Sequence, residues 1–183
     1  MSRVGKLLVA HPNLPETDWF RKTVVYIYSD THEHTLGITL NVETSTTINR
    51  LCYDKGIIYP DSHTRVNKGG PVSESAILML HSDDWIGNNT ISAGPGYRLS
   101  SDNNMLERLS LGDEPAYWRM CLGLSAWAPG QLDLEIAGEF PYSKSNSWLI
   151  CDANDDIIFN YNGDEQWRAA VDLCSQQIIN NYF

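Results

Sequence analysis

The feature that most constrains the fold is a series of short apolar runs, each of strand length, close together near the N-terminus. Residues 23–28 read TVVYIY and residues 35–42 read TLGITLNV. Both runs are rich in β-branched and aromatic side chains, which favour extended strands. A shorter apolar run at residues 6–10 precedes them, and the polar stretch Ser29–His34 suits a hairpin loop. The chain is therefore expected to begin with a group of neighbouring strands.

More runs of strand length follow. They lie at residues 66–72 (interrupted by Gly69-Gly70-Pro71), 76–81, 90–93, 97–99 and 117–127, and in a late hairpin formed by residues 148–151 and 157–160. Helices are predicted at Thr46–Lys55, Ser101–Leu111, Pro129–Ala137 and Asp164–Ile179, from capping residues and from apolar residues at helical spacing. Strands and helices do not alternate strictly. We therefore predict an α+β fold with a mixed or antiparallel, partly barrel-like sheet flanked by helices.

Charge and length limit the possible classes of protein. The 183 residues suit one compact domain, expected to span residues 1–183. The chain has 13 Lys and Arg against 23 Asp and Glu, a net charge of −10, so its mean field repels nucleic acid. No segment approaches the roughly 20 apolar residues of a membrane span, and no signal sequence is evident, so a cytoplasmic location is expected.

The cysteines and the common catalytic motifs offer little chemistry. Cys52, Cys121, Cys151 and Cys174 are widely spaced, and we expect reduced, buried thiols. The sequence has neither a phosphate-binding glycine loop nor an HExxH zinc motif, and GLSAW at residues 123–127 lacks the last glycine of a nucleophile elbow. No cofactor is predicted.

Five segments in series resemble the AlgH/YqgE family of small bacterial proteins. They are LLVAHPNLPETDWFRKTVVYIY (7–28), LGITLN (36–41), GGPV with ILMLH (69–81), GLSAWAPGQLDLEI (123–136, with Trp148 beyond it) and WRAAV (167–171). One departure is Asn41-Val42-Glu43, where the family often has Asn-Arg-Pro or Asn-Lys-Pro. The resemblance implies the family's fold over nearly the whole chain, and the family label of transcriptional regulator.

Two polar clusters invite a metal interpretation. Asp30, His32 and His34 could supply ligands from one side of a hairpin, although a solvated hairpin tip explains them more simply. The stretch at residues 152–156 begins like a calcium loop, but Ile157 stands where that loop needs glycine. We predict a polar turn there, and no metal site.

The candidate ligand-binding residues are Gly69, Gly70, Pro71, His81, Trp127, Gln131 and Glu135. The glycines permit close backbone approach and could hold an anion, but a tight bend between strands is the alternative. His81 ends an apolar run, where a hydrogen-bonded core histidine is the alternative. Trp127 lies beside Gln131 and Glu135, which are one helical turn apart, and the three could form the wall of a groove. The alternative is a packed Trp127 and two solvated side chains. We predict a groove that joins these three segments.

Three functions remain open. The first is a non-catalytic binding or regulatory module that acts through a small-molecule or protein partner. The second is an enzyme that uses Glu135 or His81 as acid or base, or Cys121 as nucleophile. The third is a DNA-binding regulator, which the net charge disfavours. The sequence does not identify the ligand or the oligomeric state.

Overall fold

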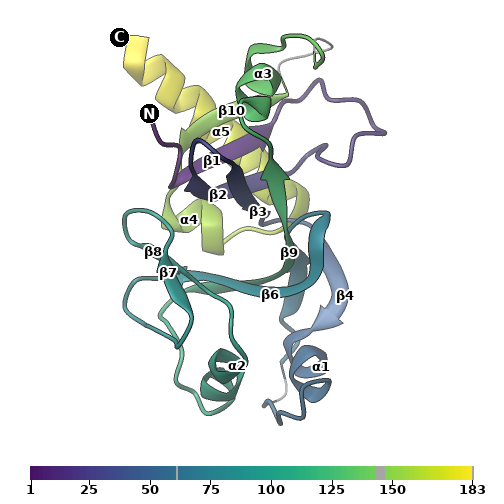
Figure 1. Cartoon of the computed structure of the whole chain (residues 1–183), viewed down its shortest axis with the longest axis vertical. Coiled ribbons are helices and arrows are strands. Elements are labelled where there is room, and N and C mark those ends of the chain that lie inside the picture. The colour runs from purple at the N-terminus through teal and green to yellow at the C-terminus, as the bar shows by residue number, and fades with distance from the viewer. Residues whose placement is uncertain (61, 143–146, 183) are drawn as a thin grey trace.

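The apolar runs near the N-terminus form three adjacent antiparallel strands at the centre of the computed structural model, which describes residues 1–60, 62–142 and 147–182 (Figure 1). The strands in these residues are β1 (Lys6–Ala10), β2 (Val24–Asp30), β3 (Thr35–Thr39), β4 (Glu43–Thr47), β5 (Arg65–Lys68), β6 (Val72–Ser82), β7 (Thr90–Ser92), β8 (Tyr97–Ser100), β9 (Trp118–Trp127) and β10 (Trp148–Asp152). The helices are α1 (Ile48–Tyr53), α2 (Asn103–Ser110), α3 (Gln131–Ala137), α4 (Asp155–Phe159) and α5 (Gly163–Tyr182).

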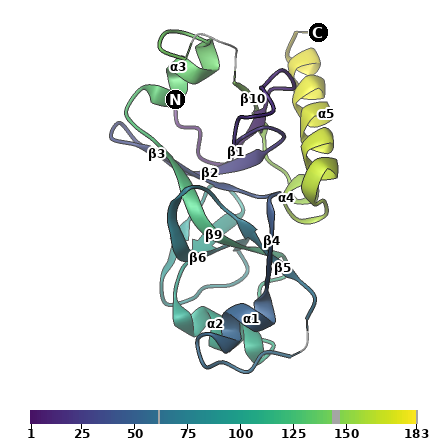
Figure 2. The same cartoon turned by 90° about the vertical axis from the view of Figure 1, so that its right-hand side faces the viewer.

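One curled sheet contains all of these strands, in the order β10-β1-β2-β3-β9-β6-β8-β7, with β4 and β5 beside this path. Its pairs are antiparallel except β5 with β9, which is parallel. The long strand β9 joins the two ends of the molecule, because it pairs with β6 near Trp118 and with β3 at Trp127. Figure 2 shows α3 and α5 at one end and α1 and α2 at the other. The predicted mixed, partly barrel-like α+β fold is confirmed.

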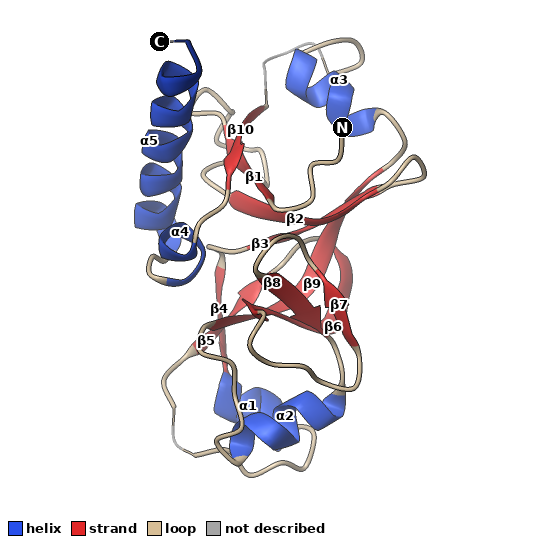
Figure 3. Cartoon of the chain, turned by 90° about the vertical axis from the view of Figure 1, so that its left-hand side faces the viewer, coloured by secondary structure: helices blue, strands red, loops and turns tan. Residues whose placement is uncertain are grey.

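β1 and β2 contain continuous apolar runs, at residues 7–10 and 24–28, because both faces of these strands are covered. Successive side chains of a strand point to opposite faces. Leu7 and Val9 of β1 pack in the cluster that includes Cys174 of α5, whereas Leu8 and Ala10 pack with Leu132 of α3. Continuous hydrophobic runs are typical of such two-sided burial. Figure 3 shows β1 and β2 lying between α5 and α3.

The opposite end of the molecule has its own core. Ile48, Leu51 and Cys52 of α1 are buried, as are Met105, Leu106 and Leu109 of α2, and both sets belong to one hydrophobic cluster. These apolar stripes follow the helical spacing that the sequence predicts. The caps lie later than expected. Thr47 caps α1, where Ser45 or Thr46 was expected, and Asp102 caps α2, where Ser101 was expected.

The predicted late hairpin is wrong in its second half. Residues 157–160 were expected to be a strand, but Asp155–Phe159 forms α4. The side chain of Asn154 accepts a hydrogen bond from Ile157 N, and Asp155 and Asp156 occupy the first turn. Such a cap with acidic residues after it stabilises a helix start, and this outweighs the strand preference of the two isoleucines.

The structure also shows a strand that the sequence did not indicate. β4, with the sequence ETSTT, is polar and half-exposed, so it has no hydrophobic alternation. It is held by pairing with β5 and by the hydroxyl of Thr44, which donates to the carbonyl of Val66 at 2.7 Å.

Arg119 on β9 is one of the basic residues of the chain, and its side chain is buried. Its guanidinium donates to the carbonyls of Ile158 (2.7 Å), Tyr161 (2.7 Å) and Leu40 (3.0 Å). Burial among neutral acceptors lowers the pKa of Arg119 from its usual value. The residue therefore joins the connection between α4 and α5 to the sheet and presents no charge to a partner.

Among the described helices, none is long and apolar enough to cross a membrane.

Candidate functional site

The carboxylate of Glu135 is the point where three of the predicted residues meet. Trp127 Nε1 donates to Glu135 Oε2 at 2.9 Å, and Gln131 Nε2 donates to Oε1 at 2.9 Å. The indole of Trp148 donates to the same Oε2 at 2.9 Å. The end of β9, the inner face of α3 and the start of β10 thus converge on one charged group.

The local sequence explains this arrangement. Gly130 adopts a left-handed conformation with φ of 74°, so the chain turns sharply after β9 and α3 begins at Gln131. The predicted helix start at Pro129 is therefore two residues too early. Gln131 Oε1 accepts the backbone N–H of Ala128 at 3.0 Å, which orients its amide nitrogen toward Glu135 one turn later.

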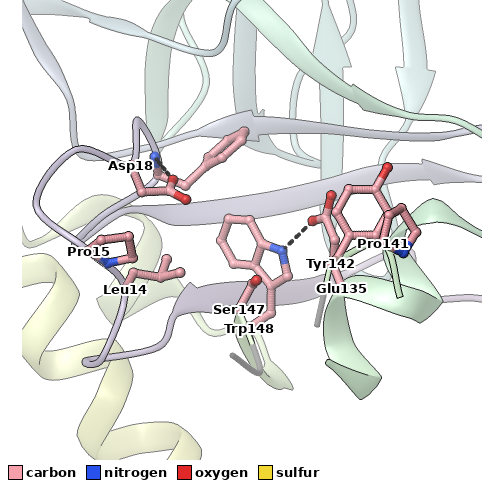
Figure 4. A pocket seen from close by; sticks show the side chains of 9 residues that line it. Leu14, Pro15, Asp18, Glu135, Pro141, Tyr142, Ser147 and Trp148 are labelled. Atoms are coloured by element: carbon pink, nitrogen blue, oxygen red, sulfur yellow. Dashed lines mark hydrogen bonds between the residues drawn. The ribbon is translucent and has the colours of Figure 1, made fainter. Parts of the chain in front are cut away.

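A pocket of about 300 Å³ opens beside this network. It is lined by Leu14, Pro15, Asp18, Phe20, Glu135, Pro141, Tyr142, Ser147 and Trp148. We call it the aromatic pocket. Figure 4 shows Glu135 lying between the indole of Trp148 and the ring of Tyr142. The volume lies at the lower end of the range of about 300–1,000 Å³ that is typical of small-molecule sites.

The aromatic side chains at the pocket pack against one another. Phe20 stacks on Trp127 with centroids 6.0 Å apart and an interplanar angle of 25°, and Trp148 meets both rings at steep angles. The rings of Phe20 and Trp148 have centroids 5.1 Å apart and an interplanar angle of 70°. Trp127 and Trp148 lie 6.0 Å apart at 79°, and Trp127 is buried behind the pocket. Such edge-to-face packing fixes the ring positions, so the walls are pre-formed.

The charges in the pocket are negative. Asp18 and Glu135 line it, and no Lys, Arg or His is among its described lining residues. Asp18 Oδ1 accepts the backbone N–H of Phe20 at 2.8 Å, which holds the loop against the pocket.

The structure does not bring Gly69, Gly70 and Pro71 to this pocket. Both glycines are buried in the crossing from β5 to β6, and Gly69 N donates to the carbonyl of Leu122 at 2.7 Å. A Cβ on Gly70 would lie 2.1 Å from the carbonyl oxygen of Leu124. This is the tight bend that was the alternative interpretation, and its backbone is occupied by neighbouring strands.

His81 also lies elsewhere. It pairs with Trp118 at the far end of β9, nine residues and roughly 30 Å along the strand from Trp127. Its side chain is buried, with Nδ1 2.7 Å from the carbonyl of Ser82 and Nε2 2.8 Å from the hydroxyl of Ser100. The three predicted segments therefore do not form one groove. His81 lies at the far end of β9, and the Gly69-Gly70 bend, although it packs against Ser125 near Trp127, is enclosed by backbone and does not line the pocket.

Other reactive groups are occupied or inaccessible. All four cysteines are free and buried, and burial raises the pKa of the Cys121 thiol to about 12. At the β2–β3 hairpin, the Asp30 carboxylate accepts from Arg3 N (2.7 Å) and Thr35 Oγ1 (2.7 Å). The described residues contain no group of three or more His, Cys, Asp or Glu side chains placed to hold a metal ion.

Of the residues that line the pocket, the sequence predicted only Glu135 as a site residue. Leu14, Asp18 and Phe20 lie in the irregular connection between β1 and β2, where no periodicity marks a role. Tyr142 follows α3 in another irregular segment. The block at residues 7–28 that resembles the AlgH/YqgE family contained the only signal for this loop.

Comparison with known protein families gives one match over most of the chain. The profile of a family described as AlgH-like matches residues 7–179. A UPF0301 protein of Gluconobacter oxydans is 34% identical over 171 residues, which cover 91% of this chain and 88% of that protein. A UPF0301 protein of Methylococcus capsulatus is 31% identical over 91% of this chain and 88% of its own length.

Solved structures show the same fold. The AlgH protein of Pseudomonas aeruginosa superposes with a TM-score of 0.75 at 24% identity, covering 92% of this chain and 87% of that one. The protein DIP2367 of Corynebacterium diphtheriae gives a TM-score of 0.70 at 18% identity, covering 93% and 86%. These similarities extend the fold to distant relatives and carry no statement about a ligand.

Proposed function

This chain belongs to the AlgH-like family, and from that premise we propose that it is a non-catalytic binding module with regulatory action, whose ligand occupies the aromatic pocket. The observation that carries the proposal is the pre-formed pocket around Glu135, with three hydrogen bonds fixing the carboxylate. A cavity with apolar walls and a few oriented polar groups is the usual form of a small-molecule site. The label of regulator comes from the family resemblance. A regulatory action of this chain is therefore part of the proposal.

The residues considered for catalysis favour binding over turnover. A general base must present a free lone pair to the proton that it removes. Glu135 directs its carboxylate at Trp127, Gln131 and Trp148. His81 is buried and hydrogen-bonded at both nitrogens, and Cys121 is fully buried with a raised thiol pKa.

A direct DNA-binding role has less support. The net charge of −10 opposes phosphate binding, and Arg119, Arg3 and Lys22 are engaged within the protein. Regulation through a bound ligand, transmitted to a protein partner, agrees better with these charges.

A thermal-shift screen of the pure protein against metabolites, nucleotides and metal ions tests the proposal. A ligand at a hundredfold excess over its Kd adds about 2.7 kcal/mol of stability, and this raises the Tm of a domain of this size by roughly 5–10 °C. The matched variants are Tyr142→Ala, which removes an exposed wall of the pocket, and Glu107→Gln on the distant, exposed face of α2.

We expect at least one compound whose stabilisation is reduced in Tyr142→Ala and retained in Glu107→Gln. A screen in which no compound responds to the pocket variant would overturn the proposal. Stabilisation that is equal in both variants would place binding outside the aromatic pocket, with the same consequence.

A further inference from the structure

Building on the proposed function, we infer that the aromatic pocket selects small organic cations of the quaternary ammonium type. The features that point to this class are two carboxylates, three aromatic walls and the absence of a basic side chain among the described lining residues. Each feature favours a positive charge, and together they favour one that is weakly hydrated.

The hydrogen bonds of Glu135 distinguish between kinds of cation. Its Oε2 already accepts from two indoles and its Oε1 from Gln131 Nε2. Three of the roughly four lone-pair sites of the carboxylate are therefore occupied, which leaves little acceptor capacity. A primary ammonium or a guanidinium must find acceptors for all of its N–H groups when it loses water, whereas a tetraalkylammonium has no N–H groups.

The aromatic walls favour the same class. Phe20 and Trp148 stand at 70° with centroids 5.1 Å apart, so they form a corner, and Tyr142 adds a third ring. Aromatic cages bind methylated ammonium groups through the negative faces of their rings and through contact with the methyl groups. The pocket volume of about 300 Å³ admits a small ion of this kind.

Among the described residues, the two basic side chains that follow Phe20 in the sequence are paired with carboxylates. Arg21, the nearest arginine in the sequence, pairs with Glu16 at 3.3 Å, and Lys22 pairs with Asp164 at 2.9 Å. Asp18 accepts the backbone N–H of Phe20 through one oxygen, and its side chain lines the pocket in Figure 4.

The first experiment compares three probes that differ in one property at a time. Choline carries a trimethylammonium, 3,3-dimethyl-1-butanol has the same shape without charge, and ethanolamine has the charge without the methyl groups. Each is titrated at constant ionic strength while the indole N–H signals are followed by NMR. We expect choline to shift the Trp148 signal and to bind about tenfold more tightly than either of the other two.

Variants then locate the effect. Tyr142→Ala should weaken choline binding about fivefold, and Tyr142→Phe should retain it, because the ring and not the hydroxyl forms the wall. Asp18→Asn keeps the oxygen that accepts from Phe20 and removes the charge, so it should weaken choline about threefold and leave 3,3-dimethyl-1-butanol unchanged. Glu107→Gln, which removes an equal charge at the other end of the molecule, should have no effect.

The results separate this inference from the proposed function. If the neutral alcohol or ethanolamine binds as tightly as choline, or if neutral or anionic compounds occupy the pocket and choline does not, the quaternary ammonium assignment is overturned and the binding module remains. If no probe and no compound of the thermal-shift screen responds to Tyr142→Ala, both proposals fall.

Discussion

At the residue scale, Glu135 connects three consecutive parts of the chain: the end of β9, α3 and the start of β10. Its carboxylate accepts from Trp127 on β9, from Gln131 within α3 and from Trp148 on β10. The residue therefore contributes to the stability of the fold as well as to the charge of the aromatic pocket.

Replacing Glu135 with Leu should destabilise the protein by about 3 kcal/mol, because it leaves two indole N–H groups and an amide without their acceptor. Urea unfolding followed by far-UV circular dichroism measures this change. Glu107→Leu is the matched control, because Glu107 is an exposed residue of α2 whose side chain makes no hydrogen bond or ion pair with the described residues. A loss of stability of about 0.5 kcal/mol or less is expected for this variant. Equal unfolding midpoints for both variants would contradict the structural role of Glu135.

His81 gives a residue-scale prediction about pH. Burial lowers the pKa of His81 from the usual value of about 6.5. Below that pH, His81 is therefore protonated more readily in the unfolded chain than in the folded protein. The stability contributed by neutral His81 is therefore complete above pH 6.5 or so, and it is lost as the pH falls toward the lowered folded pKa.

The free energy of unfolding should fall more between pH 7.5 and pH 5.5 in the wild type than in His81→Gln. Urea titrations at several pH values provide the comparison, and the exposed histidine His32 supplies the control variant His32→Gln, whose pH profile should match the wild type. A His81→Gln profile parallel to that of the wild type would show that His81 titrates normally in the fold.

At the element scale, the crossing from β5 to β6 depends on the absence of side chains. β5 runs parallel to β9 and β6 returns antiparallel to it, so the connecting backbone passes directly against Leu124 and Ser125. A Cβ on Gly70 would meet three backbone atoms of this strand within 2.5 Å. Gly70 is therefore required because there is no room for a side chain at this position.

Gly70→Ala should therefore destabilise the protein by more than about 3 kcal/mol, since two backbones would have to separate. Gly56→Ala is the control, because Gly56 has open space around it and needs only its φ of 75°. The cost there should be about 1 kcal/mol. Differential scanning calorimetry of both variants tests the contrast, and similar losses in the two would refute the steric explanation.

At the scale of the whole molecule, acidic residues outnumber basic ones, 23 to 13. The net charge is −10, Arg119 is buried, and the other basic residues that could attract phosphate are mostly paired with carboxylates. The protein should therefore show a Kd above about 100 µM for duplex DNA at physiological salt, weaker than ordinary non-specific binders. Fluorescence anisotropy with a labelled duplex measures this, and micromolar binding that weakens steeply with salt would restore the DNA-binding hypothesis.

The sequence alone predicted the elements whose side chains repeat with a clear period. The apolar strands predicted at residues 6–10, 23–28 and 117–127, and the stripes of α1 and α2, follow from local propensity and from the need to bury one face or two. β2 runs two residues further than predicted, to Asp30. The sequence also placed Gln131 and Glu135 one helical turn apart and close to Trp127, but it did not predict the hydrogen bond from the indole to the carboxylate.

Only the tertiary structure decided where the distant segments meet. It placed Asp18, Phe20, Tyr142 and Trp148 around Glu135. It placed His81 at the far end of β9 and enclosed the Gly69-Gly70 crossing against the backbone of Leu124 and Ser125. It also gave α4 and β4 their conformations, through the Asn154 cap and through pairing with β5. The physical reason is that strand pairing and long-range hydrogen bonds depend on partners remote in the chain, and local propensity contains no information about those partners.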